Sequence, residues 1–118
     1  MEPLTIDALF DAAIHIQLVQ EKSLTMTFSG SVIRIKFPTT RRLADFLAVP
    51  HYYMLPYFGM MEKEDLITRM ERVGIMTTAK GSRKFIQRMM ERYSPEAEQV
   101  LGPVVCTELS LQVRHEEE

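Results

Sequence analysis

Basic and aromatic side chains gather in the middle of this 118-residue chain, where their chemistry suits contact with a polyanion. Residues 38–93 hold ten Lys and Arg against six Asp and Glu, a net charge of +4. Residues 94–118 carry −5 and residues 1–37 carry −1, so the total of −2 hides a basic middle segment. Such a segment favours phosphate contact, although a run of charges is more often a solvated face.

Ten side chains of this segment are candidates for contact with DNA. Arg and Lys neutralise phosphates, Thr at a helix start can anchor one, and His and Tyr can contact phosphates or stack on bases. The candidates are Thr39, Thr40, Arg41, His51, Tyr52, Tyr53, Arg69, Arg72, Lys80 and Arg83. The alternatives are a solvated helix face or an intramolecular acid for the basic residues, and packing against another subunit or the N-terminal helix for the aromatic ones.

No pattern typical of catalysis or metal binding accompanies these residues. The sequence contains no Gly-rich phosphate loop, nucleophile elbow or paired-carboxylate motif. His15, His51 and His115 are not spaced with Cys106 as metal ligands are. A lone cysteine cannot form an internal disulfide, and we expect Cys106 to be a small buried hydrophobic residue. We therefore predict no enzymatic activity, no metal and no cofactor.

Hydrophobic periodicity predicts the elements that flank the basic segment. Apolar residues at helical spacing after Thr5 predict an amphipathic helix that ends near Lys22. Apolar and polar residues alternate on both sides of Ser29-Gly30, which predicts a β-hairpin with one buried face. That face would consist of Leu24, Met26, Phe28, Ile33, Ile35 and Phe37. Alternation over residues 104–114 predicts a C-terminal strand that pairs with the hairpin.

The basic segment itself predicts three helices and a very short hairpin. Thr39 or Thr40 is suited to cap a short helix, and apolar residues at helical spacing up to Met61 predict a second one. Residues around Val73-Gly74 favour a minimal hairpin. Thr78 caps a longer helix that ends before Pro95, and a further turn or two runs to Gly102. The chain as a whole is therefore predicted to be of the α+β class.

Two motifs in this segment lie in the order and at the distance found in a known family. The first runs without a gap from Leu43-Ala44 to Leu66-Ile67, and the second is the segment Thr77-Thr78-Ala79-Lys80-Gly81. With these motifs, residues 33–90 resemble the winged helix-turn-helix superfamily, especially compact prokaryotic transcriptional regulators.

The resemblance implies a winged helix-turn-helix core over about residues 33–93. To this core the chain would add the N-terminal helix and hairpin, residues 5–37, and the C-terminal strand, residues 104–114. All of these would form a single domain over residues 1–118.

Three residues depart from the family pattern. Ala48 and Asp65 stand where glycine is usual, and both sites tend to need a left-handed backbone. Pro56 lies inside the second helix, where it would lack an amide hydrogen and press on the carbonyl of Tyr52, at a cost of about 3 kcal/mol. The helix must therefore kink or begin at Pro56, with residues 51–55 forming an extended or single-turn entry.

The sequence thus predicts a DNA-binding protein, in particular a transcriptional regulator that acts as a homodimer. A cytoplasmic location is expected, because neither a signal peptide nor an apolar run of membrane-spanning length is evident. The alternative is a winged-helix module that binds a protein partner instead of DNA. Its docking surface would include Tyr52, Tyr53, Leu55, Tyr57 and Phe58.

Overall fold

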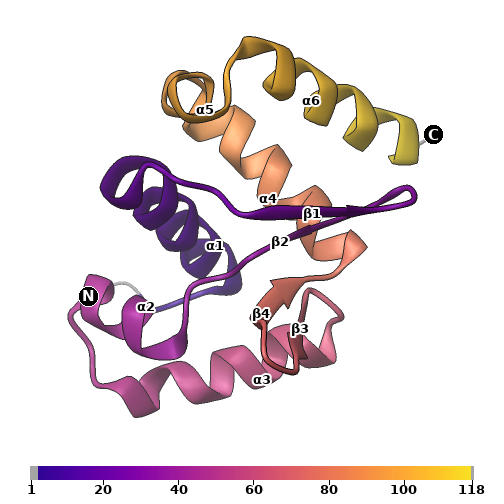
Figure 1. Ribbon diagram of the computed structural model, residues 1–118. Coiled ribbons are helices and arrows are strands. Elements are labelled where there is room, and N and C mark those ends of the chain that lie inside the picture. The colour runs from indigo at the N-terminus through magenta and orange to yellow at the C-terminus, as the bar shows by residue number, and fades with distance from the viewer. Residues whose placement is uncertain (1–2, 118) are drawn as a thin grey trace.

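The computed structural model describes residues 3–117, which form helices and two small antiparallel hairpins (Figure 1). The helical elements are α1 (Ile6–His15), the π-helix η1 (Ile16–Glu21), α2 (Thr40–Leu47), the 3₁₀ helix η2 (His51–Met54), α3 (Leu55–Lys63), α4 (Ala79–Arg92), α5 (Ser94–Leu101) and α6 (Pro103–Glu117). The strands are β1 (Met26–Ser29), β2 (Val32–Ile35), β3 (Ile67–Met70) and β4 (Gly74–Thr77). The predicted α+β class is confirmed.

Helix α1 begins at its predicted cap, because the hydroxyl oxygen of Thr5 accepts a hydrogen bond from the amide of Ala8 at 3.0 Å. The helical path continues through η1 and ends at Lys22, which adopts a left-handed conformation with φ of 53°. Within η1 the side chain of Gln17 is buried, and its amide nitrogen donates to the carbonyl of Lys36 at 2.9 Å. This bond ties the end of the N-terminal helix to the chain that leaves the first hairpin.

The first hairpin pairs β1 with β2, with Phe28 opposite Ile33. Its predicted buried face is only partly correct. Ile33 and Ile35 are buried in β2, whereas Phe28 in β1 is 62% exposed. The difference arises because α4 packs against β2, while β1 is the outer strand of a hairpin whose tip projects away from α1 (Figure 1).

Backbone requirements at the ends of α2 and α3 are met as expected. Thr39 caps α2, since its hydroxyl oxygen accepts a hydrogen bond from the amide of Arg42 at 3.1 Å. Ala48 ends α2 and Asp65 follows α3, with φ values of 57° and 60°. Both residues therefore adopt the left-handed conformation expected at these two positions from the sequence.

Pro56 sets the start of α3. The helix begins at Leu55, so that Pro56 stands in the first turn, where its missing amide hydrogen costs no helical hydrogen bond. Residues 51–54 form one 3₁₀ turn before it. The later start predicted from Pro56 is thus confirmed, and the segment His51–Lys63 follows one edge of the molecule (Figure 1).

The second hairpin, predicted around Val73-Gly74, pairs β3 with β4. Chain beyond the end of β2 joins this hairpin: the amide of Phe37 donates to the carbonyl of Ile75 at 2.8 Å, and Lys36 forms an antiparallel bridge with Met76. The segment that follows β2 therefore lies beside β4.

Two buried hydroxyl groups fasten β2 to β4 and α4. The amide of Ile35 donates to the hydroxyl oxygen of Thr77 at 2.8 Å. The hydroxyl groups of Thr77 and Ser82 lie 2.6 Å apart, and Ser82 donates to the carbonyl of Ile33. These bonds satisfy polar groups that would be costly to bury alone.

The predicted C-terminal strand at residues 104–114 is wrong, because this segment belongs to α6. Cys106, Leu109 and Val113 are buried at helical spacing, whereas Leu111, which the alternating pattern placed beside them, is 58% exposed. The apolar residues of this short segment fit both the two-residue period of a strand and the 3.6-residue period of a helix. Packing of α6 against α4 and α5 selected the helix. Consequently, no strand from this segment pairs with the first hairpin.

One hydrophobic core connects the helices to the chain after β2. The ring of Phe10 lies 5.2 Å from that of Phe37 and 6.4 Å from that of Phe85, and Phe37 lies 6.0 Å from Phe58. Helix α1 is central to this arrangement, with α2 and α3 on one side and α4, α5 and α6 on the other (Figure 1).

Ion pairs reinforce the contact of α1 with α4. Arg88 makes two hydrogen bonds with the carboxylate of Asp11, at 2.7 and 2.8 Å. Lys84 forms an ion pair with Asp7, and Arg88 lies 3.5 Å from the same carboxylate. These pairs direct the side chains of Lys84 and Arg88 towards α1.

Candidate nucleic-acid interface

The first part of the candidate interface is the corner where α2 and η2 meet. The hydroxyl oxygen of Thr40 lies 2.7 Å from Nε2 of His51, so the start of α2 is hydrogen-bonded to the start of η2. The Thr39 hydroxyl is engaged in capping α2, and Arg41 is exposed beside it. Four of the predicted residues, Thr39, Thr40, Arg41 and His51, therefore lie together.

The second part is an outward surface without charged groups, which we term the apolar α3 face. It begins with the exposed rings of Tyr52 and Tyr53, whose centroids lie 5.0 Å apart in an edge-to-face arrangement. From Leu55 to Met60 the exposed residues of α3 are apolar or lack a side chain. The complete face consists of Tyr52, Tyr53, Leu55, Pro56, Gly59 and Met60.

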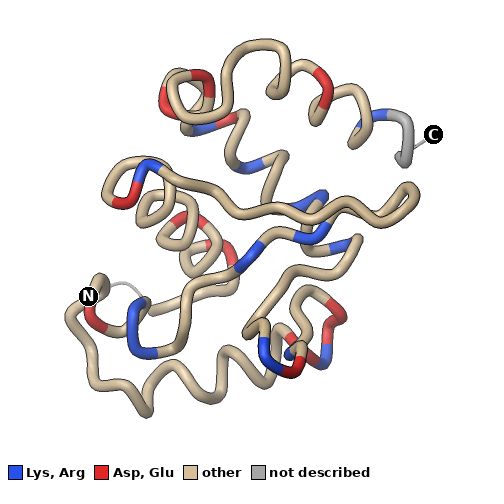
Figure 2. The backbone as a smooth tube through the Cα atoms, in the orientation of Figure 1, with Lys and Arg blue, Asp and Glu red and all other residues tan. Residues whose placement is uncertain are grey.

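Cations flank the apolar α3 face at both ends. Arg41 lies at the α2 corner, Lys63 ends α3, and Arg72 lies in the turn between β3 and β4. Among the described residues, none forms a hydrogen bond or ion pair with the side chains of these three cations. In Figure 2, α3 is tan, which marks uncharged residues, until its C-terminal end, where basic and acidic residues lie close together. The cations therefore remain available to an external anion.

Acidic residues lie among these cations. Residues 40–72 hold five basic and five acidic residues, so their net charge is zero. Glu62 accepts a hydrogen bond from Nε of Arg69 at 3.0 Å, and both side chains are largely exposed. Arg69, a predicted site residue, thus already has a carboxylate partner at the surface.

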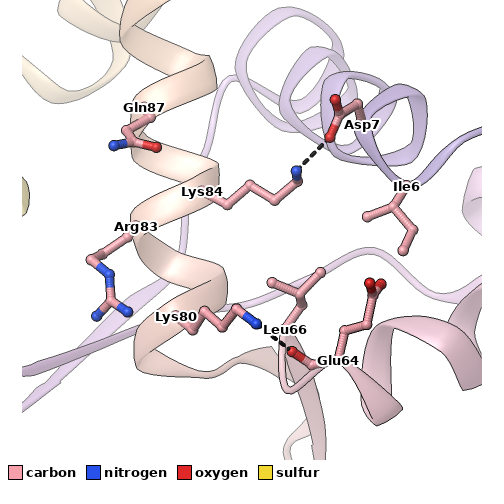
Figure 3. A pocket seen from close by; sticks show the side chains of 8 residues that line it. All are labelled: Ile6, Asp7, Glu64, Leu66, Lys80, Arg83, Lys84 and Gln87. Atoms are coloured by element: carbon pink, nitrogen blue, oxygen red, sulfur yellow. Dashed lines mark hydrogen bonds and ion pairs between the residues drawn. The ribbon is translucent and has the colours of Figure 1, made fainter.

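Lys80 and Arg83 occupy a different setting from the other candidates. Both line a cavity of about 470 Å³ between α1, the chain that follows α3, and α4, together with Lys84 (Figure 3). The ammonium group of Lys80 donates to the carbonyl of Glu64 at 3.0 Å. The structure thus brings these two residues together at the base of the second hairpin, apart from the α2 corner.

Sequence reasoning misplaced two residues and missed others. Phe58 is fully buried and Tyr57 is half-buried, so neither offers the open docking surface assumed for a protein partner. The outward residues Gly59, Met60 and Lys63 were not among the candidates. A glycine inside a helix was the available signal, since it costs stability there.

The described part of the chain also bears on metal binding, on the thiol of Cys106 and on membrane spanning. No group of three or more His, Cys, Asp or Glu side chains is arranged to hold a metal ion there, and the side chain of His115 lies outside that part. Cys106 is buried as expected, and burial raises the pKa of its thiol, as does the nearby Glu98 to a lesser extent. No helix among the described residues is both long and apolar enough to cross a membrane.

Comparisons with known proteins do not add to this description. No protein-family model, curated protein or solved structure matches the chain.

Proposed function

We propose that this protein binds double-stranded DNA through a winged helix-turn-helix and regulates transcription. The observation that carries the proposal is the uncharged, outward face of α3 with unpartnered cations at both ends. In this arrangement the apolar α3 face lies in the major groove, and Arg41, Lys63 and Arg72 contact phosphates on its two sides.

The order of the elements supports a winged helix. Helix α1 and the first hairpin are followed by α2, α3 and the β3–β4 hairpin. The chain that follows β2 lies beside β4, because the amide of Phe37 donates to the carbonyl of Ile75. The β3–β4 hairpin would serve as the wing, and α2 and α3 precede it, with Ala48 at the end of α2.

The dimensions also support groove binding. Four residues of 3₁₀ helix and nine of α-helix span roughly 20 Å from His51 to Lys63. The major groove of B-DNA is about 12 Å wide. A segment of this length can therefore place its centre in the groove while the cations at its ends contact the two phosphate backbones.

Fluorescence polarisation with duplex DNA of random sequence provides the test. We expect the affinity to fall as salt rises from about 50 to 200 mM, because each phosphate contact releases counterions. Arg41→Ala combined with Arg72→Ala should reduce the slope of log affinity against log salt by about 0.9 per lost contact. Arg114→Ala removes an exposed cation from α6 and serves as the control. Absence of salt-sensitive binding, or an unchanged slope in the double variant, would rule out the proposal.

The proposal also includes an oligomeric state and a cellular location. A homodimer is proposed because one short helix specifies little sequence, and two-fold symmetry doubles the contacted site. A cytoplasmic location is proposed because the lone Cys106 has no cysteine partner within the chain. Sedimentation of the protein with and without duplex DNA measures the stoichiometry.

A second candidate is a protein-interaction module. The balanced charge of residues 40–72 and the exposure of Tyr52, Leu55 and Met60 favour it, because protein interfaces are apolar at their centre and poor in charge. Its surface would be the apolar α3 face without Tyr57 and Phe58. Self-association that is abolished by Tyr52→Ala, in a protein without DNA affinity, would support this candidate over DNA binding.

A further inference from the structure

The apolar α3 face offers very few groups that hydrogen-bond base edges. Leu55 and Met60 are 48% and 49% exposed, and Pro56 and Gly59 complete the first turns of α3. No Arg, Lys, Asn or Gln occurs between His51 and Met61. Specific contacts with guanine and adenine depend on those side chains, and contact with the C5-methyl group of thymine depends on apolar ones.

Gly59 leaves the backbone of α3 uncovered on this face. A Cβ built at Gly59 meets no atom within 4 Å, so the fold itself leaves room for a side chain there. Glycine in a helix interior is nevertheless unfavourable compared with alanine. No contact within the described part of the fold requires a glycine here, and its missing side chain leaves the backbone of α3 open to a ligand.

From these observations we infer that α3 selects duplex DNA by its thymine methyl groups. Leu55 and Met60 would bury these methyls, and Gly59 would let α3 settle deep enough in the groove for both contacts. The inference rests on the proposed DNA binding. DNA is chosen as the occupant because the side chains of Arg41, Lys63 and Arg72 have no partner among the described residues and are therefore available to phosphates.

The tyrosine pair completes the apolar surface at its N-terminal end. Tyr52 is 63% exposed and Tyr53 is 51% exposed, and their edge-to-face contact holds the two rings together. This pair extends the surface towards the phosphates that Arg41 would contact. The sequence specificity is therefore assigned to Leu55 and Met60, and the tyrosines are assigned to the groove edge.

The test compares duplexes that differ only in the C5-methyl group of their pyrimidines. One pair contains dT or dU opposite dA, and a second pair contains 5-methyl-dC or dC opposite dG, with each sequence otherwise unchanged. Burial of one methyl group corresponds to about a fourfold change in affinity. We expect about fourfold weaker binding for each buried methyl lost from dT to dU, and tighter binding on methylation of dC.

Variants connect the preference to the named residues. Leu55→Ala combined with Met60→Ala should bring the affinities for the dT and dU duplexes to the same value. Leu111→Ala, which truncates an exposed leucine on α6, should leave the ratio between them unchanged. Circular dichroism of each variant verifies that the fold is retained.

The possible outcomes separate this inference from the function on which it rests. Salt-sensitive binding with equal affinity for dT and dU duplexes would overturn methyl recognition and leave DNA binding intact. Absence of binding to every duplex would overturn both. A preference for dT that survives in the double variant would assign the contact to other residues and thus contradict the inference. Burial of the apolar α3 face by a second copy of the chain, detected as self-association lost in the double variant, would also contradict it.

Discussion

The carbonyl oxygen of Leu66 occupies the space that a Cβ at Gly81 would need, since the two atoms would lie only 1.8 Å apart. The same carbonyl accepts a hydrogen bond from the amide of Thr78 at 3.0 Å, which fixes the start of α4 against the chain entering β3. We therefore expect Gly81→Ala to lower the free energy of unfolding by about 3 kcal/mol or more, because backbone must move. Urea denaturation measures the loss. An unchanged midpoint would show that the first turn of α4 can shift without cost.

Gly59→Ala should have the opposite effect on stability. Nothing in the fold obstructs the added methyl group, and alanine is favoured in a helix by about 0.5–1 kcal/mol. We expect a higher urea midpoint together with a severalfold loss of DNA affinity by polarisation. Gly81→Ala, in which the same substitution should destabilise, is the matched comparison. Tighter or unchanged DNA binding by Gly59→Ala would exclude a close approach of DNA at this turn.

Glu62→Gln should strengthen DNA binding. The substitution removes an acid beside the proposed phosphate contacts and frees Arg69, whose Nε lies 3.0 Å from the Glu62 carboxylate. If Arg69 then contacts one phosphate, the salt slope should become steeper by about 0.9. Stability should change by about 1 kcal/mol or less, because exposed ion pairs contribute little. Glu98→Gln, which removes an exposed carboxylate from α5, should leave DNA affinity unchanged.

Asp7 should make stability depend on acid pH. The hydrogen bond from Lys84 lowers the pKa of Asp7 below its ordinary value of 3.8, an effect opposed by burial and supported by the charges of Lys84 and Arg88. The folded state therefore favours the carboxylate, and its contribution is present above the unfolded pKa and lost as pH falls through the lowered folded value. Asp7→Asn should be less stable than the parent at neutral pH, with the difference vanishing in acid.

Urea titrations at several pH values check the Asp7 prediction. Glu108→Gln removes another exposed carboxylate, on α6, and provides the comparison. A stability difference between Asp7→Asn and the parent that persists unchanged below pH 3.8 would contradict a role for the ion pair.

Local signals in the sequence predicted the helix boundaries well. Thr5, Thr39 and Thr78 each accept a backbone hydrogen bond as N-caps, because short hydroxyl side chains act on amides only three residues away. Pro56 fixed the start of α3 for an equally local reason. Such features depend on neighbouring residues and can be inferred without knowledge of the tertiary contacts.

Features that depend on distant contacts were less predictable. The segment containing Leu109 and Val113 fits either a strand or a helix, and only packing against α4 and α5 decides between them. The sequence likewise indicated which residue types could contact DNA but not which were already engaged. Lys80 donates a hydrogen bond to the carbonyl of Glu64. Phe58 is buried in the core. Both facts depend on which residues lie close together in the folded chain.

The hydroxyl of Thr77 has a consequence for hydrogen exchange. The amide of Ile35 is bonded to this side chain, which in turn contacts Ser82 at the start of α4. Deuterium uptake by the Ile35 amide should therefore follow the opening of α4 rather than the fraying of a two-stranded hairpin. The first hairpin, the second hairpin and the start of α4 would then behave as one cooperative unit, and slow exchange at Ile35 would report its integrity.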